Sequence, residues 1–170
     1  GIGLQVAKRA NAFDMRILAV DPVATEKPNY VEDLWRSDQL HQMLRQSDFL
    51  AICCPLTPQT QGIIGTVEFG VMKETAFLVN IARGRIVDQP ALIEALQTNQ
   101  IAGAGLDVTE PEPLPADNPL WEMENVIITP HHAGQSPKSA PRIFQVLCEN
   151  LKRFSNNQPL ISVVDKRQWF

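Results

Sequence analysis

Three polar side chains with complementary chemistry follow strand-like stretches of this 170-residue chain. Arg83, Glu112 and His131 each stand within a few residues of the end of such a stretch. A guanidinium can bind a carboxylate through two parallel hydrogen bonds. An imidazole can donate or remove a proton near neutral pH, and a neighbouring carboxylate favours its protonated form. The set therefore suits polar chemistry on a small acid.

Each of these side chains has a rival in the sequence. Arg83 could instead be a surface arginine that pairs with a nearby acid. Glu110 competes with Glu112 in one acidic loop, and His132 competes with His131. The separations of 29 residues (112 − 83) and 19 residues (131 − 112) are compatible with three loops at neighbouring strand ends.

Alternating strands and helices would have to position this chemistry. Short apolar runs predict buried parallel strands at residues 16–20, 49–54, 77–79, 101–108 and 126–129. Apolar residues at helical spacing, with capping residues, predict helices at residues 1–13, 37–44, 67–72, 88–100 and 139–154. Residues 22–36 are predicted to be mostly loop, and His41 to be a solvated helix residue. This order is typical of a doubly wound parallel α/β sheet, whose ligands bind at the carboxyl ends of the strands.

A candidate nucleotide-binding pair lies near the start of the chain. Gly1-Ile2-Gly3 leads into the first predicted helix, and Asp21 follows the first predicted strand, 18 residues after Gly3 (21 − 3). An acid about 20 residues after a glycine-rich turn binds the ribose hydroxyls of NAD and would repel the 2′-phosphate of NADP. The alternatives are an ordinary helix start or a tag scar at the glycines, and a simple turn at Asp21-Pro22.

The composition is that of a soluble globular domain, with 44% hydrophobic and 20% charged residues. The net charge of −4 and the lack of a lysine or arginine cluster argue against a nucleic-acid or anionic-membrane partner. No apolar run approaches the roughly 20 residues that span a bilayer. Cys53, Cys54 and Cys148 form no plausible disulfide framework, so we expect reduced thiols, no metal site and a cytoplasmic protein.

Several motifs in a fixed order make the sequence similar to the D-isomer-specific 2-hydroxyacid dehydrogenases. This NAD-dependent family includes D-3-phosphoglycerate dehydrogenase and hydroxypyruvate reductase. The matching segments run nearly from end to end of the chain: residues 1–3, 20–22, 55–60, 80–84, 107–113, 129–131 and 162–165.

The resemblance implies an oxidoreductase that transfers a hydride between NAD(H) and a small D-2-hydroxy acid or 2-oxo acid. It makes His131 the proton donor and acceptor, Glu112 its carboxylate partner, and Arg83 the group that holds the substrate carboxylate and polarises the carbonyl. The residues that it assigns to the cofactor are Gly1, Ile2, Gly3, Asp21, Pro55, Thr60, Ile81, Ala82, Arg83, Asp107, His131 and Gly134.

The resemblance also implies how the chain is divided. Residues 1–136 would form a Rossmann-type NAD-binding domain that lacks its first strand, and residues 137–170 a helix and tail that pack on an absent substrate-binding domain. We therefore expect the chain alone to be catalytically silent and to bind the cofactor weakly, and the full-length protein to be a homodimer. Asp14 stands where the family usually has glycine, so a left-handed backbone is expected there.

Two other functions stay open on the same fold. Formate-dehydrogenase-like enzymes resemble this chain but have glutamine where it has Glu112. Scaffolds similar to the C-terminal-binding-protein corepressors keep the nucleotide pocket and act by binding partners without turnover.

Overall fold

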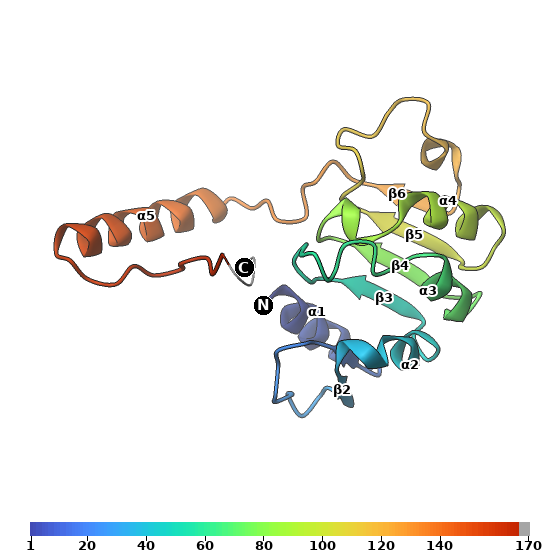
Figure 1. Ribbon diagram of the computed structural model, residues 1–170, viewed down its shortest axis with the longest axis horizontal. Helices are drawn as coiled ribbons and strands as arrows, with labels where there is room; N and C mark the ends of the chain where they lie inside the picture. The colour runs from blue at the N-terminus through green and yellow to red at the C-terminus, as the bar shows by residue number, and fades with distance from the viewer. Residues whose placement is uncertain (167–170) are drawn as a thin grey trace. The chain divides into compact units, whose positions relative to one another are not determined.

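The computed structural model describes residues 1–166, which form parallel strands joined by helices (Figure 1). The chain divides into two compact units, Gly1–Pro130 and the part that begins at His131. The last four residues of the predicted C-terminal segment, 167–170, lie outside the described residues. Within residues 1–166, no helix is both long enough and apolar enough to cross a membrane.

The first unit contains two parallel sheets. One pairs β1 (Leu18–Val20) with β2 (Asp33–Trp35). The other holds four parallel strands in chain order: β3 (Phe49–Ile52), β4 (Phe77–Asn80), β5 (Gly103–Leu106) and β6 (Val126–Ile128). The predicted parallel α/β fold is therefore confirmed, with its strands distributed over two sheets.

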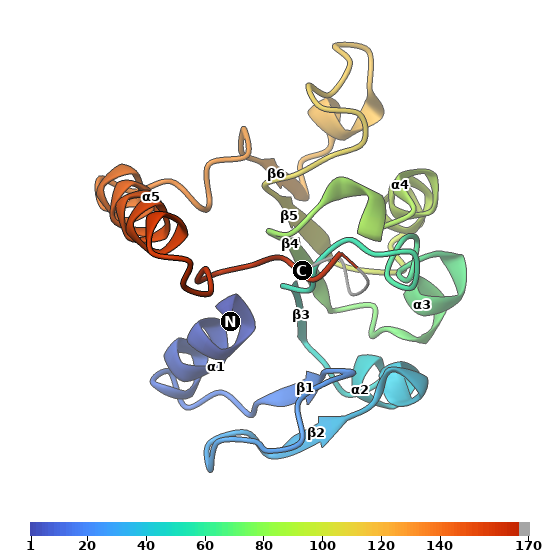
Figure 2. The same ribbon diagram turned by 60° about the vertical axis from the view of Figure 1, so that its left-hand side comes forward.

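Helices lie on both sides of the four-stranded sheet. Those of the first unit are α1 (Ile2–Asn11), α2 (Leu40–Leu44, preceded by the 3-10 turn Ser37–Gln39), α3 (Thr66–Val71) and α4 (Gln89–Gln97). Short 3-10 turns also occur at Gly84–Ile86 and Pro119–Glu122. Figure 2 shows α3 and α4 on one side of the sheet and α1 on the other, as expected of a doubly wound arrangement.

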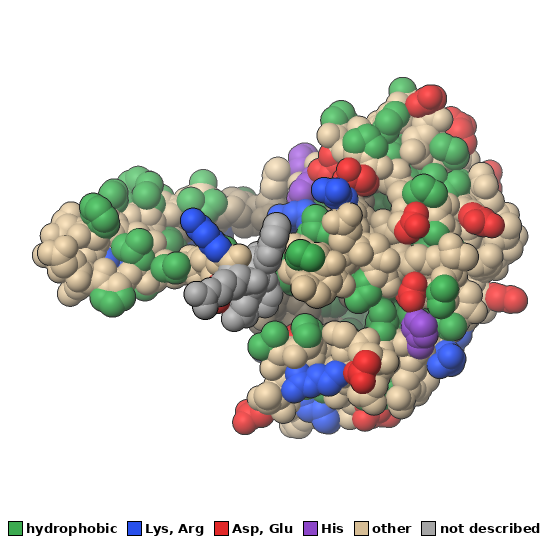
Figure 3. Space-filling model, in the orientation of Figure 1, with side chains coloured by type: hydrophobic (Ala, Val, Ile, Leu, Met, Phe, Trp, Pro, Cys, Tyr) green, Lys and Arg blue, Asp and Glu red, His purple; other side chains and the backbone are tan. Residues whose placement is uncertain are grey.

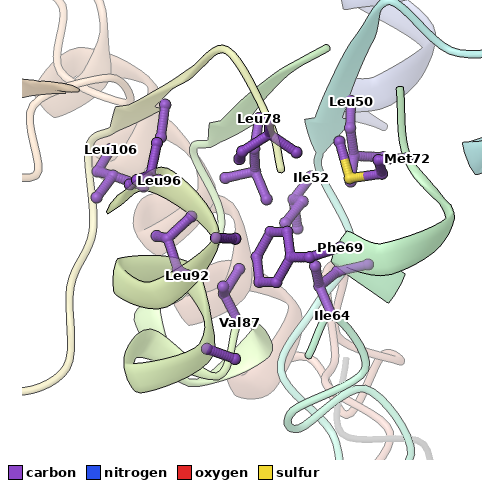
Figure 4. Close-up of a cluster of buried hydrophobic side chains, with 14 of the residues drawn as sticks. Leu50, Ile52, Ile64, Phe69, Met72, Leu78, Val87, Leu92, Leu96 and Leu106 are labelled. Atoms are coloured by element: carbon purple, nitrogen blue, oxygen red, sulfur yellow. The ribbon is translucent and has the colours of Figure 1, made fainter. Parts of the chain in front are cut away.

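The hydrophobic core fills the space between this sheet and the helices α3 and α4. Phe69 of α3 is 1% exposed and points toward Leu78 of β4 and Leu92 of α4 (Figure 4). Along β3 the side chains alternate, so that Leu50 and Ile52 are buried while their neighbours face outward. Burial of each such side chain contributes about 1.5–3 kcal/mol to folding. This core fixes the strands whose ends carry the candidate site.

Local signals in the sequence place the ends of α4 as predicted. The Asp88 side chain accepts a hydrogen bond from the amide of Ala91 at 3.3 Å, and Pro90 lies in the first turn, where its missing N–H is harmless. Asn99 follows the last turn with φ of 55°, a left-handed conformation that asparagine tolerates. Asp14 also adopts this conformation, with φ of 57°, as predicted.

Two sequence-based predictions about this unit are incomplete. The segment 22–36 is mostly loop, as predicted, but it also contains β2, a strand of only three residues that begins with a charged side chain and so gives little signal. His41 lies on α2 with its side chain 41% exposed, as predicted, but its Nε2 also lies 2.8 Å from Oε1 of Glu68 and links α2 to α3.

The second unit is dominated by α5 (Ser139–Ser155), which matches the helix predicted for residues 139–154. Its tail folds back on it, since the Asn150 side chain both donates to the carbonyl of Ile161 at 3.0 Å and accepts from its amide at 2.9 Å. Apolar side chains gather on the surface of this helix (Figure 3). The exposed ones are Ile143, Phe144, Val146, Leu147, Leu151 and Phe154.

Candidate active site

The candidate site begins at the carboxyl edge of β4 and β5. These strands are parallel neighbours, and Asn80 at the end of β4 lies opposite Leu106 at the end of β5. One further ladder bond joins the amide of Asp107 to the carbonyl of Asn80 at 3.0 Å. The loop that carries Arg83 and the loop that carries Glu112 therefore start side by side.

Asn80 shapes the turn that presents Arg83. Its side chain is only 1% exposed; its Oδ1 accepts from the amide of Ala82 and its Nδ2 donates to the carbonyl of Arg83, both at 3.0 Å. Nη1 of Arg83 donates to the carbonyl of Ala82 at 2.6 Å, and the Arg83 side chain is exposed. A buried amide thus fixes the backbone under an exposed guanidinium.

Gly84 brings the two loops into direct backbone contact. A Cβ built on Gly84 would lie 2.1 Å from the carbonyl oxygen and 2.2 Å from the carbonyl carbon of Thr109. No side chain larger than hydrogen can occupy that space. Glycine at this position is therefore required for the close approach of the Arg83 turn to the start of the Glu112 loop.

The two rival acids of the second loop are placed differently. Oε1 of Glu112 accepts from the amide of Thr109 at 3.2 Å, so this carboxylate folds back over the base of its loop. The Glu110 carboxylate instead lies 4.0 Å from the guanidinium of Arg85, and both of these side chains are about half exposed. The hydroxyl of Thr109 donates to the carbonyl of Pro111 at 3.0 Å and further orders the turn.

Asp107 links the ends of β5 and β6. It is 5% exposed and accepts a hydrogen bond from the hydroxyl of Thr129 at 2.5 Å. His131 lies two residues after Thr129, but it is the first residue of the second unit. Its backbone is left-handed, with φ of 54°. Gly134 also belongs to the second unit. The pairing of His131 with Glu112 accordingly stays a prediction.

The start of α1 lies beside the carboxyl end of β3. A Cβ built on Gly3 would be 3.5 Å from Cβ of Cys53, the residue after β3, and Gly3 is exposed. Backbone amides at a helix start attract phosphate groups. The Asp21 carboxylate, exposed at the end of β1, accepts from the amides of Val23 and Ala24 at 2.8 and 2.9 Å. These bonds form the turn that the sequence offered as the alternative interpretation, and a carboxylate has further acceptor sites for a ribose hydroxyl.

The loop after β3 is held by its own side chains. The hydroxyl of Thr60 donates to the carbonyl of Pro55 at 2.7 Å and accepts from the amide of Thr57 at 2.8 Å. Thr60 therefore orders the loop that also contains Pro55. Ile81 and Ala82 are half-buried and buried, so their contribution to a ligand site would come from the backbone.

Burial raises the pKa of the thiols of Cys53 and Cys54 above the ordinary value, and the neighbouring Cys54 adds to the effect on Cys53. Both are free cysteines of intermediate burial, as predicted. A raised pKa lowers the thiolate fraction near neutral pH, so neither has the character of an activated nucleophile.

Sequence reasoning missed two polar residues at this edge. The guanidinium of Arg36 donates to the carbonyl of Pro22 at 2.7 Å, next to Asp21. Arg36 directly follows β2, so recognition of that strand would have placed it beside the end of β1. Gln89, the first residue of α4, makes two hydrogen bonds to the backbone of Glu110. No sequence signal points to these bonds, because they join residues 21 positions apart.

Comparisons with known proteins give one consistent answer. Residues 1–133 match the family described as "D-isomer specific 2-hydroxyacid dehydrogenase, NAD binding domain". The chain is 43% identical over 158 residues to a glyoxylate reductase of Korarchaeum cryptofilum, covering 92% of this chain and 47% of that protein. It is 37% identical over 164 residues to a D-3-phosphoglycerate dehydrogenase of Methanocaldococcus jannaschii, covering 96% of this chain and 31% of that protein. The chain thus spans half or less of the length of these relatives.

Solved structures agree with the sequences. An NADPH-dependent glyoxylate/hydroxypyruvate reductase from Sinorhizobium meliloti, in complex with NADP and sulfate, superposes with a TM-score of 0.90 at 28% identity. That match covers 99% of this chain and 54% of the other. A D-isomer specific 2-hydroxyacid dehydrogenase family protein from Klebsiella pneumoniae gives a TM-score of 0.89 at 34% identity, covering 98% of this chain and 52% of that one. The chain belongs to the D-isomer specific 2-hydroxyacid dehydrogenase family.

Proposed function

We propose that the protein containing this chain transfers a hydride between NAD(H) and a small 2-hydroxy acid or the corresponding 2-oxo acid. The observation that carries the proposal is the backbone contact of Gly84 with Thr109, which joins the Arg83 turn to the Glu112 loop at one sheet edge. A cation and a carboxylate are in this way presented from neighbouring strand ends, where ligands bind in parallel α/β sheets.

Arg83 is proposed to hold the substrate carboxylate and to polarise the carbonyl. Its guanidinium is exposed, while the turn beneath it is fixed by the buried amide of Asn80. A planar guanidinium can form two parallel hydrogen bonds with a carboxylate, and a fixed positive charge stabilises the negative charge that develops on the carbonyl oxygen.

His131 is proposed to donate the proton to the developing alkoxide, and to remove it in the oxidative direction. Glu112 would orient the imidazole and favour its protonated form. The Glu112 carboxylate is itself ordered by the amide of Thr109.

The residues at the edge of β1 and β3 fit a dinucleotide. The start of α1 would take the phosphates with the amides near Gly3, and Asp21 would accept from the ribose hydroxyls. The nicotinamide supplies the hydride chemistry, while the protein binds and orients. Solved relatives hold NADP, and Arg36 brings a cation close to Asp21. We nevertheless propose NAD, because the Asp21 carboxylate would repel a 2′-phosphate.

The proposed substrates are small 2-oxo acids of the kind named in relatives, which include glyoxylate reductases and hydroxypyruvate reductases. The proposal is tested by assaying NADH oxidation in the intact protein with glyoxylate, hydroxypyruvate, pyruvate and 3-phosphohydroxypyruvate. The Arg83→Lys variant, which keeps the charge but loses the bidentate geometry, should raise KM for the preferred acid while NADH affinity is unchanged. Turnover by Arg83→Lys with an unchanged KM would show that Arg83 does not bind the substrate carboxylate.

Further expectations about the whole protein stay predictions. They are the homodimer, the cytoplasmic location, the docking of residues 137–170 on a substrate-binding domain, and the catalytic silence of this chain by itself. The half-buried free thiols are compatible with a reducing compartment. Analytical ultracentrifugation of the intact protein, and an activity assay of residues 1–170 alone, test the assembly and the silence directly.

A further inference from the structure

The loop that carries Glu112 is ordered locally by contacts among residues 109–112. The amide of Thr109 bonds to Glu112, and its hydroxyl bonds to the carbonyl of Pro111. These bonds shape the turn, but they are internal to it. They cannot by themselves hold the turn in place against the neighbouring loop that carries Arg83.

Gln89 makes a specific connection between the two loops. Its Nε2 donates to the carbonyl of Glu110 at 2.8 Å, and its Oε1 accepts from the amide of the same residue at 3.0 Å. A primary amide is the side-chain group that offers a donor and an acceptor together in this geometry. Glutamate could only accept, and leucine, of similar size, could do neither.

Gln89 is itself firmly anchored to the segment that carries Arg83. It is the first residue of α4, directly after the capping residue Asp88, whose amide donates to the carbonyl of Ile64 at 2.8 Å. Between Arg83 and Asp88 the chain is buried at Ile86 and Val87, which are 0% and 5% exposed. The segment from Arg83 to Gln89 is therefore a short, packed connection.

An ion pair also joins the two loops, but it is less directional than the Gln89 hydrogen bonds. The Arg85–Glu110 ion pair spans 4.0 Å with both side chains 53% exposed, and such pairs contribute little. Gly84 packs against the backbone of Thr109. The double hydrogen bond from Gln89 is a directional contact that orients the backbone of Glu110, two residues before Glu112.

We infer that Gln89 is a positioning residue that holds the Glu112 loop in a fixed position relative to the Arg83 turn. This role rests on the proposed function. Gln89 acts through the backbone of Glu110. Loss of these bonds would let the backbone of Glu110, two residues before Glu112, shift relative to the Arg83 turn. Because misplacement by about 1 Å costs on the order of 100-fold in rate, turnover should fall while substrate binding at Arg83 persists.

The test compares Gln89→Leu, Gln89→Glu and the control Gln97→Leu in the intact protein. Gln97 lies at the other end of α4 and is exposed. Gln89→Leu should lower kcat by roughly ten- to a hundred-fold, with KM for the 2-oxo acid changed by less than about three-fold. Gln89→Glu can still accept the hydrogen bond from the Glu110 amide, so its kcat should lie between those of Gln89→Leu and the wild type. Gln97→Leu should match the wild type.

Two further measurements separate positioning from simple destabilisation. The number of NADH molecules bound per chain should be unchanged in Gln89→Leu, whereas a partly unfolded enzyme would lose binding capacity in proportion to kcat. Hydrogen exchange at the Glu110 amide should speed up in Gln89→Leu and stay unchanged in Gln97→Leu.

Each outcome decides a different claim. A kcat for Gln89→Leu within two-fold of the wild type, or unchanged exchange at Glu110, would overturn the positioning role. Absence of turnover in the wild type with any 2-oxo acid would overturn the proposed function and the catalytic consequence together. In that case the exchange at Glu110 would still decide separately whether the hydrogen bonds between Gln89 and Glu110 exist.

Discussion

Replacement of Gly84 by alanine should force apart the two loops that form the candidate site. The added Cβ would lie 2.1 Å from the carbonyl oxygen of Thr109 and 2.9 Å from the amide nitrogen of Glu110. Ordinary contacts begin near 3.4 Å, so the two backbones must separate by about 1.3 Å (3.4 − 2.1). Both partners are main chain, so no side-chain rotation can relieve the overlap. Overpacking of this kind costs about 1–3 kcal/mol of stability.

The same displacement moves the Arg83 turn away from the Glu112 loop. A shift of about 1 Å at a reacting centre lowers kcat/KM on the order of 100-fold. We therefore expect Gly84→Ala to lose both stability, measured by urea unfolding, and activity, measured by NADH oxidation in the intact protein.

Gly70→Ala is the matched control, because a Cβ on Gly70 in α3 meets nothing within 4 Å. A glycine within a helix is about 0.5–1 kcal/mol less favourable than alanine, so the control should be slightly more stable and fully active. A Gly84→Ala variant that unfolds at the wild-type urea concentration and keeps kcat/KM within two-fold would contradict this prediction.

Three further predictions concern the surroundings of the site. Asn80→Leu should lower the free energy of unfolding by about 2–4 kcal/mol, because it leaves the amide of Ala82 and the carbonyl of Arg83 without their partner. Urea unfolding checks this, and a loss below about 1 kcal/mol would contradict it. Burial alone would raise the pKa of Glu68, but hydrogen bonds from His41 and from the backbone amides of Gly65 and Glu68 outweigh that effect, so that its pKa lies below the ordinary value of 4.5. Its stabilising effect is fully present above that ordinary pKa, which applies to the unfolded chain, and is lost as pH falls through the lower folded pKa. Glu68→Gln should therefore weaken the protein at pH 7 and much less at pH 3, and an equal loss at both would be inconsistent. Because burial raises their pKa values, Cys53 and Cys54 should react with iodoacetamide at pH 7.5 more slowly than glutathione, as followed by peptide mass spectrometry; faster labelling would contradict this.

Strong local signals explain what could be predicted from the sequence. Continuous apolar runs identified β3 and β4, and the capping aspartate with its following proline identified the start of α4. The order of polar clusters then placed Arg83 and Glu112 at neighbouring strand ends, which the parallel pairing of β4 and β5 supports. These features depend on residues close together in the sequence.

The missed features depend on contacts between distant segments. β2 has three residues and is recognisable only from its pairing with β1. The His41–Glu68 link joins helices 27 residues apart, and the Gln89–Glu110 bonds span 21 residues. Neither pair has a local pattern. The close approach at Gly84 is likewise a property of two backbones, although the glycine itself was part of a recognised motif.

The most direct test of the proposed chemistry is NADH oxidation at neutral pH by the intact protein and its His131→Gln variant. The acids are glyoxylate, hydroxypyruvate, pyruvate and 3-phosphohydroxypyruvate, and NADH binding is measured in parallel. We predict turnover of at least one acid by the wild type, a loss of about 100-fold or more in kcat in the variant, and similar NADH affinity in both. Turnover that survives the substitution would contradict the role of His131. Tight NADH binding by the wild type without turnover of any acid would contradict the proposed enzyme and favour a nucleotide-binding scaffold.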